Sequence, residues 1–384
     1  MCHEQPLTAI LAGEPTPDAT LFRESAADCE RRYGAAGEML AELDTIATTG
    51  LTPRDRATRG LLRHELEGIR AFHEVDAHRR PSLFPNGPAL MTSHFANTAN
   101  VDDAESAERY VDRLATVQAY LRDLEENLRA GHGGGFRYPR LVLDCAIKSI
   151  RGAVAGPVES SPWLGPFKRS PAGGKDSVRR GGERAQALIA GVLVPACEAF
   201  ARFLEGPLAE GARSTVACTD APEGHEFYRA VVRDFVTTDA SPEEIHALGL
   251  AEVERLAKEI DAVGVQAGYP NDLDAYRRFL ATDAFFAPSK EALREQIEIL
   301  SKRIDRRIPA FFGRIPRITY GVETMPDAMS EHMPPAYAQP SPADRTEAGI
   351  HWVTSLPARF PSYLQLPVAL HEAWPGHLDR KSVV

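Results

Sequence analysis

Two stretches of the chain carry apolar residues at clear helical spacing. In residues 102–130 they recur at alternating four- and three-residue steps, and Gly131 ends the run, which predicts one long amphipathic helix. Residues 242–264 begin with Ser241-Pro242-Glu243-Glu244, which combines an N-cap, a proline at the first helical position and a capping-box glutamate. We expect the apolar residues of this second helix to form a buried face: Ile245, Leu248, Val253, Leu256, Ile260 and Val263.

Weaker helical patterns occupy much of the remaining chain. The segment that contains Pro195 is expected to kink there, because proline interrupts the hydrogen-bond ladder. The segments are 18–47, 53–78, 139–152, 181–205, 225–236, 272–281 and 289–306.

The stretches between these helices have no helical spacing. Residues 131–135 predict a turn, and residues 155–180, rich in Gly, Pro, Ser and Arg, predict a long surface loop or a disordered insert. Residues 313–345 carry six prolines and predict irregular structure or short strands, while residues 349–356 fit one strand. No repeat and no clear linker appear. We therefore expect a mainly α fold, an elongated multi-helix domain over residues 1–378 with a minor β element.

Composition narrows the function classes. The 384 residues include 44 basic and 54 acidic side chains, for a net charge of −10, which argues against a general nucleic-acid binder. Five scattered cysteines give no disulfide framework, and the first twenty residues resemble no signal peptide. No run approaches the roughly 18 apolar residues of a membrane helix. The expectation is a cytoplasmic protein without a membrane partner.

The chemistry concentrates in seven residues, His371-Glu372-Ala373-Trp374-Pro375-Gly376-His377. Imidazole is a common zinc ligand, and an adjacent carboxylate can act as a general base. Histidines six residues apart lie about 120° apart on an undistorted helix, so a straight helix cannot aim both at one ion. Pro375 and Gly376 predict that the helix ends near Trp374 and that the chain folds back to present His377.

This reasoning assigns His371 and His377 as ligands of Zn2+ and Glu372 as the base that takes a proton from water. Pro367 suits the start of the helix that carries them. Two histidines are too few, since a catalytic zinc usually has three protein ligands. The alternative interpretation is an ordinary helix end with a surface His-Glu pair.

The motif and its surroundings resemble a bacterial family, the "domain of unknown function 885" family of zincin-like metallopeptidases. The likeness includes Thr238–Leu250 with Glu252-Val253, the segment from Ile308-Pro309 through Phe312-Gly313 and Pro316, and Pro335-Ala336-Tyr337. Asp103–Glu105 with Tyr110 and Leu114, and Gly135-Phe136 with Pro139-Arg140, resemble its N-terminal half. The likeness thus covers nearly the whole chain.

The resemblance implies a mainly helical fold of the HExxH-peptidase kind and zinc-dependent hydrolysis of a peptide-like bond. His371 and Glu372 carry over as ligand and base, and His377 carries over as the second ligand. Family members often have two histidines after the Pro-Gly, whereas Leu378 stands in the second place here. By analogy with related zinc peptidases, a glutamate ligand is expected further downstream.

The last residues, 379–384, form an unusual tail. Their sequence, DRKSVV, matches one reading frame of a common sequencing adapter. We therefore expect Leu378 to be about the last genuine residue and the chain to be an incomplete, inactive form. The missing third ligand would then lie beyond this point.

Three further residues are candidates for substrate contact. His351 lies in the predicted strand before the motif, where related peptidases place an edge strand that pairs with substrate. Tyr337 and Tyr363 are candidate oxyanion stabilisers. Simple packing is the alternative for all three.

The sequence thus predicts a zinc-dependent peptidase or amide hydrolase acting on a peptide or peptide-like small substrate. A helical binding or scaffold protein without catalysis is the alternative, and a metal enzyme acting on a non-peptide carbonyl is a third. The sequence does not indicate the oligomeric state.

Overall fold

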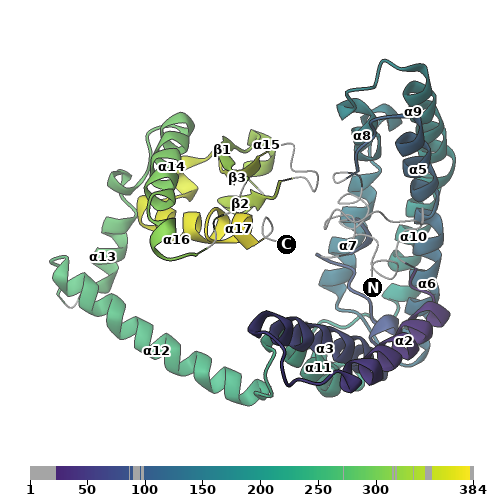
Figure 1. Ribbon diagram of the computed structural model, residues 1–384, viewed down its shortest axis with the longest axis horizontal. Coiled ribbons are helices and arrows are strands. Elements are labelled where there is room, and N and C mark those ends of the chain that lie inside the picture. The colour runs from purple at the N-terminus through teal and green to yellow at the C-terminus, as the bar shows by residue number, and fades with distance from the viewer. Residues whose placement is uncertain are drawn as a thin grey trace. The chain divides into compact units, whose positions relative to one another are not determined.

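The computed structural model describes residues 23–380, apart from residues 86, 90–95, 97–98, 271, 314, 316–317, 332 and 342–347. The fold is mainly helical with one small sheet, as predicted (Figure 1). The described residues fall into two compact units, 23–247 and 248–380, which are described separately below. The predicted single domain over residues 1–378 stays a prediction.

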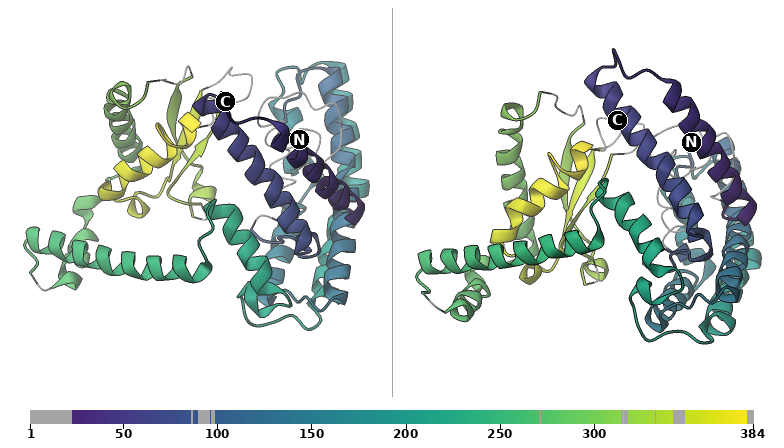
Figure 2. Two further views of the ribbon diagram at one scale, coloured as in Figure 1. Left: turned by 60° about the horizontal axis from the view of Figure 1, so that its bottom comes forward. Right: turned by 90° about the horizontal axis from the view of Figure 1, so that it is seen from below.

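The first unit begins with two helices that lie side by side, α2 (Ala26–Thr45) and α3 (Pro53–Glu74), drawn in purple in both views of Figure 2. Each has a polar N-cap. The Ser25 side chain accepts a hydrogen bond from the Asp28 amide, and Thr52 forms a capping box with Asp55. Residues 18–22 of the predicted helix 18–47 lie outside the described residues, and α2 corresponds to the rest of it.

The predicted helix over 102–130 is two helices, α5 (Ala104–Ala115) and α6 (Val117–Gly133). At Thr116 the backbone N–H bonds to the carbonyls of Arg113 and Leu114, and the hydroxyl donates to Arg113 O at 2.7 Å. These short-range bonds tighten the turn and divide the helix. The apolar stripe is buried across the break, as predicted: Tyr110, Leu114, Val117, Leu121, Leu124 and Leu128 are each at most 9% exposed.

The expectation of a surface loop or disordered insert over residues 155–180 is wrong. After α7 (Arg140–Ala153), the segment forms 3₁₀ turns at Val158–Ser160 and Pro162–Leu164, the helix α8 (Gly165–Arg169) and the start of α9 (Asp176–Leu188). Trp163 is 1% exposed, and its carbonyl accepts a hydrogen bond from the Tyr110 hydroxyl at 2.7 Å. A buried tryptophan thus holds the segment against α5.

The helix with the predicted kink contains a π-helical turn, Ile189–Leu193, between α9 and α10 (Val194–Glu205). Pro195 follows this turn at the N-terminal end of α10, where its missing N–H does least harm. Contrary to the expectation from sequence, Asp176–Ala209 is long and apolar enough to cross a membrane. Several of its apolar residues, such as Ile189, Leu193, Phe200 and Leu204, belong to the core of the first unit, and 39% of its apolar window is buried.

The first unit ends with 3₁₀ turns and α11 (Gly224–Val236). The chain then enters α12 (Pro242–Gln266) through the predicted capping box, in which the amides of Ser241 and Glu244 bond to each other's side chains. The expected buried face of α12 is not buried, since only Gly264 of this helix is. The exposed fractions are 63% for Leu248, 67% for Val253, 45% for Leu256, 50% for Ile260 and 49% for Val263.

The remaining 3₁₀ turns of the first unit are Ala77–Arg79, Pro207–Ala209 and Cys218–Asp220.

The second unit contains the only sheet among the described residues. Its strands are β1 (Tyr320–Thr324), β2 (Ala336–Gln339) and β3 (Gly349–Val353), in the order β1-β3-β2. β1 runs parallel to β3, and β2 runs antiparallel to it. The helices are α13 (Leu273–Leu280), α14 (Lys290–Asp305), α15 (Asp327–Ser330), α16 (Ser362–Glu372) and α17 (His377–Arg380), with 3₁₀ turns at Asp283–Phe285, Ile308–Ala310 and Pro357–Arg359.

One face of the sheet packs against α14 and α16 (Figure 1). Val322, Ala336 and Val353, one from each strand, meet Leu293 and Ile297 of α14 in a small core. Phe360, which is 0% exposed, completes this core just before α16 begins. The sheet thereby fixes the helix that carries the motif.

Candidate metal centre

The motif lies at the end of α16. This helix begins at Ser362, five residues before Pro367, which lies inside it, so the predicted start at Pro367 is wrong. The last helical residue is Glu372, two residues before the predicted end. The helix stops because Ala373 leaves helical geometry, with φ −88° and ψ −131°.

Beyond Ala373 the chain makes the predicted fold back. The Trp374–Pro375 peptide is cis, and α17 begins at His377. Gly376 lies directly against the end of α16: a Cβ added there would stand 1.9 Å from the His371 carbonyl oxygen and 2.5 Å from that of Leu370. Only glycine permits this approach of backbone to backbone.

Apolar contacts hold the returning segment to the sheet. Ala373 and Leu378, at 0% and 4% exposure, pack with Tyr320 of β1. The Trp374 ring meets the Tyr320 ring edge to face at 5.4 Å. Burial raises the pKa of Tyr320, and its protonated hydroxyl donates to Asp305 Oδ1 at 3.0 Å. Sequence reasoning missed Tyr320, since the contact joins residues more than fifty positions apart and has no local signal.

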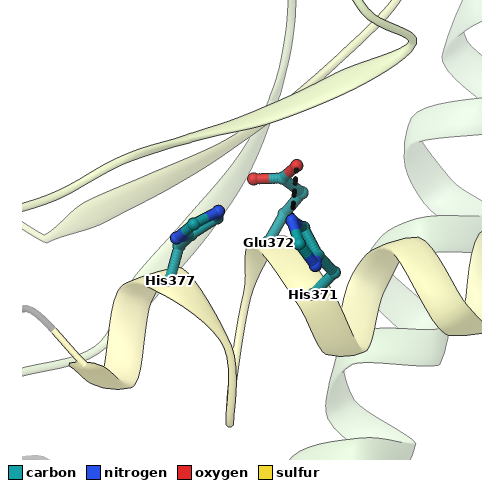
Figure 3. A group of neighbouring side chains, drawn as sticks. All are labelled: His371, Glu372 and His377. Carbon is teal, nitrogen blue, oxygen red and sulfur yellow. Dashed lines mark ion pairs between the residues drawn. The ribbon is translucent and has the colours of Figure 1, made fainter. Parts of the chain in front are cut away.

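The fold back brings His371, Glu372 and His377 together (Figure 3). The two imidazole rings are 4.8 Å apart between centroids and nearly perpendicular, at 85°. One potential ligand atom from each residue lies within 4.8 Å of the others, and His371 Nε2 is 4.0 Å from Glu372 Oε1. Among the residues that the structure describes, no other group of three such side chains lies this close.

This group suits zinc by its chemistry. Two imidazoles are part of the ligand set of many catalytic zinc sites, which use three protein ligands, and Glu372 is the proposed base beside them. Ligand atoms at zinc distances in a tetrahedron stand roughly 3.3 Å apart, so the imidazoles of His371 and His377 would have to close slightly to hold an ion. The His371 side chain is 68% exposed, whereas that of Glu372 is only 14% exposed.

His351 lies on the sheet face that packs toward α16, and its side chain is fully buried, at 0% exposure. Its strand is the central one, with β1 and β2 hydrogen-bonded on either side, so the expectation of an edge strand free to pair with substrate is wrong. Neither ring nitrogen has a hydrogen-bond partner among the described residues. Burial lowers the pKa of His351 to about 4, which keeps the ring neutral at pH 7.

His351 is therefore expected to weaken the fold as the medium becomes acidic. Between pH 6.5 and about 4, His351 binds a proton in the unfolded chain but not in the folded chain. Lowering the pH through this range therefore reduces the free energy of unfolding by at most about 3 kcal/mol. Replacing His351 with leucine should remove this loss and leave stability at pH 7 unchanged or higher, because an unpartnered polar group is removed. Urea unfolding at pH 7 and pH 5 measures both.

The comparison must be between variant and wild type at each pH. Burial raises the pKa of Glu24 in the first unit to about 7, so that carboxyl favours the folded state as the pH falls. The two effects oppose each other in the wild-type curve. An equal change of stability with pH in both proteins would contradict the prediction.

The structure does not bring the two tyrosine candidates to the histidines. Tyr337 alternates with Ala336 and Ala338 on β2 and so faces away from α16, and its ring stacks on Trp352 at 6.2 Å. Tyr363 lies two helical turns before His371, about 12 Å along the axis. Its ring meets Phe285 at 5.7 Å. Oxyanion roles for both remain predictions.

Comparison with known proteins shows which family this chain belongs to and which solved structures share its fold. A profile of the family described as "Bacterial protein of unknown function (DUF885)" matches residues 6–379. The chain is similar to the crystal structure of a putative lipoprotein from Colwellia psychrerythraea, with a TM-score of 0.83 and 18% identity over 98% of this chain and 69% of that one. No curated protein matches.

A second solved structure shares the fold. It is a putative lipoprotein of unknown function from Shewanella oneidensis, with a TM-score of 0.69 and 14% identity over 98% of this chain and 68% of that one. Identities this low show a common fold and carry no activity from one protein to another.

Proposed function

This chain belongs to the bacterial DUF885 family, and from that premise we propose that it is a zincin-like, zinc-dependent hydrolase of peptide or peptide-like amide bonds. The observation that carries the proposal is the meeting of His371, Glu372 and His377 at a helix that ends and folds back. Neither the family description nor the related structures state an activity.

His371 and His377 would hold the ion through their imidazole nitrogens. Zinc supplies a Lewis acid that polarises a carbonyl and lowers the pKa of a coordinated water to about 7. Glu372 accepts a proton from the attacking water and delivers it to the leaving amine, so that one C–O bond forms as one C–N bond breaks. Its side chain is only 14% exposed, so the carboxylate has little room to move between the two transfers.

A third protein ligand remains to be assigned. Among the residues that the structure describes, no further His, Cys, Asp or Glu side chain joins His371, Glu372 and His377. Of the tail proposed to be foreign, residues 381–384 lie outside the described residues.

A cytoplasmic location and a peptide-like substrate remain parts of the proposal, as does the absence of nucleic-acid and membrane partners. The related structures are called putative lipoproteins, a name that describes those proteins. Fractionation of cells that produce the complete protein would decide the location.

Metal analysis of the complete gene product tests the function. We expect about one zinc per chain, with hydrolysis of a mixed peptide library that stops on chelation and returns with added zinc. A zinc-free protein whose hydrolysis is indifferent to chelators would favour the scaffold alternative. Zinc binding without peptide hydrolysis, but with cleavage of an ester or other carbonyl compound, would move the proposal to a non-peptide substrate.

A further inference from the structure

An apolar groove of about 450 Å³ adjoins the three metal-site residues within the second unit. It runs between the C-terminal half of α14 with its following 3₁₀ turn and the outer face of α16. Phe311 is 71% exposed, Leu366 49% and Leu370 39%, so the groove is open. Its apolar walls include Leu300, Ile304, Ile308, Phe311, Leu366 and Leu370.

The groove and the three metal-site residues share one stretch of chain. Leu370 and Pro375 both line the groove. Leu370 directly precedes His371, and Pro375 stands two residues before His377. Part of the groove wall is therefore formed by residues that neighbour the two histidines along the chain.

Two arginines line the same groove. Arg303 and Arg307 are one helical turn apart in sequence, and both are exposed. Neither forms an ion pair with a carboxylate in the described part of the chain, and the Arg307 guanidinium lies 5.9 Å from the centre of the Phe311 ring. In a chain of net charge −10, two guanidiniums beside an apolar groove favour a ligand that is both apolar and anionic.

We propose that this groove binds the C-terminal residue of the substrate peptide, with an apolar side chain against Phe311 and Leu370 and the free carboxylate on Arg303 and Arg307. The proposal rests on the proposed function and gives it a substrate class. A carboxylate matches the paired N–H groups of guanidinium. The volume lies within the 300–1,000 Å³ typical of small-ligand sites, enough for one or two residues.

Calorimetric titration of the present chain, with chelator and without zinc, tests the groove apart from catalysis. The probes are N-acetyl-Ala-Ala-Phe, its C-terminal amide and N-acetyl-Ala-Ala-Asp. We expect the free acid of the Phe peptide to bind about tenfold more tightly than either of the others. The double variant Arg303→Gln/Arg307→Gln should remove the difference between acid and amide and keep the preference for Phe.

Two further variants test the apolar contact with Phe311 and the specificity of the effect for the groove arginines. Phe311→Ser should weaken the Phe peptide severalfold without harming the fold, because this ring is 71% exposed. Arg294→Gln is the matched control: Arg294 lies on α14 and pairs with Glu298 at 2.8 Å, and its loss should change nothing. Equal affinity for acid and amide in the wild type would overturn the proposal, as would a dimer that the groove variants dissociate.

The outcomes keep the two proposals apart. Selective peptide binding without hydrolysis by the zinc-loaded complete protein would leave the groove in place and remove the hydrolase. Hydrolysis without preference for an apolar C-terminal residue would support the hydrolase and overturn the groove proposal.

Discussion

Replacing Glu372 with glutamine is expected to lower peptide hydrolysis by the complete gene product roughly 10²–10⁴-fold while zinc content stays near one ion per chain. Glutamine keeps the size of the side chain and loses only the ability to accept a proton. Because the side chain is 14% exposed, the amide should occupy the same space without repacking. Initial rates on a fluorogenic peptide, with metal content measured on the same sample, check the prediction.

The matched control for this variant is Glu323→Gln. Glu323 is an exposed glutamate of β1, whereas the preceding residue, Val322, faces the core. The Glu323→Gln variant should hydrolyse peptides at the wild-type rate. If Glu372→Gln keeps the wild-type rate with zinc bound, another group takes the proton and the assignment of the base is wrong.

Replacing Gly376 with alanine is expected to reduce zinc affinity about 100-fold, the upper end of effects caused by residues that position ligands. The added methyl would stand 1.9 Å from one carbonyl oxygen and 2.5 Å from another. Both oxygens are backbone atoms of α16, so no side-chain rotation relieves the clash. The segment from Ala373 must shift, and His377 moves away from His371.

Competition with a chelator of known affinity measures this effect. Gly321→Ala is the control, because a Cβ added at Gly321 meets no atom within 4 Å, and its zinc affinity should equal that of the wild type. Circular dichroism should show equal helix content in both variants. Wild-type zinc affinity in Gly376→Ala would show that the close approach does not position His377.

Local sequence signals predicted what local interactions determine. The capping box at Ser241 and Glu244 and the stripe from Tyr110 to Leu128 were both confirmed, since each depends on residues three or four positions apart. The fold back at Pro375 and Gly376 was also predicted, because these residues remove or reshape helical hydrogen bonding. The position of His377 follows from that break.

Long-range packing decided the rest. Residues 155–180 have the composition of a loop, but Trp163 is buried against Tyr110, 53 positions away. The anchoring of Trp374 on Tyr320 and the central position of β3 depend on strand pairing that no local pattern reveals. The apolar face of α12 was expected to be buried from its spacing alone, and spacing does not say what covers it.

Trp374 gives the protein an intrinsic optical probe. The indole stands between the two imidazoles in sequence, and its surroundings are set by the edge-to-face contact with Tyr320. Of the other two tryptophans, Trp163 is buried in the core of the first unit, and Trp352 stacks on Tyr337 on the sheet face turned from α16. A change in the Trp374 emission on loading an ion would report on the fold back, and rapid mixing would time the capture of the ion without any attached dye.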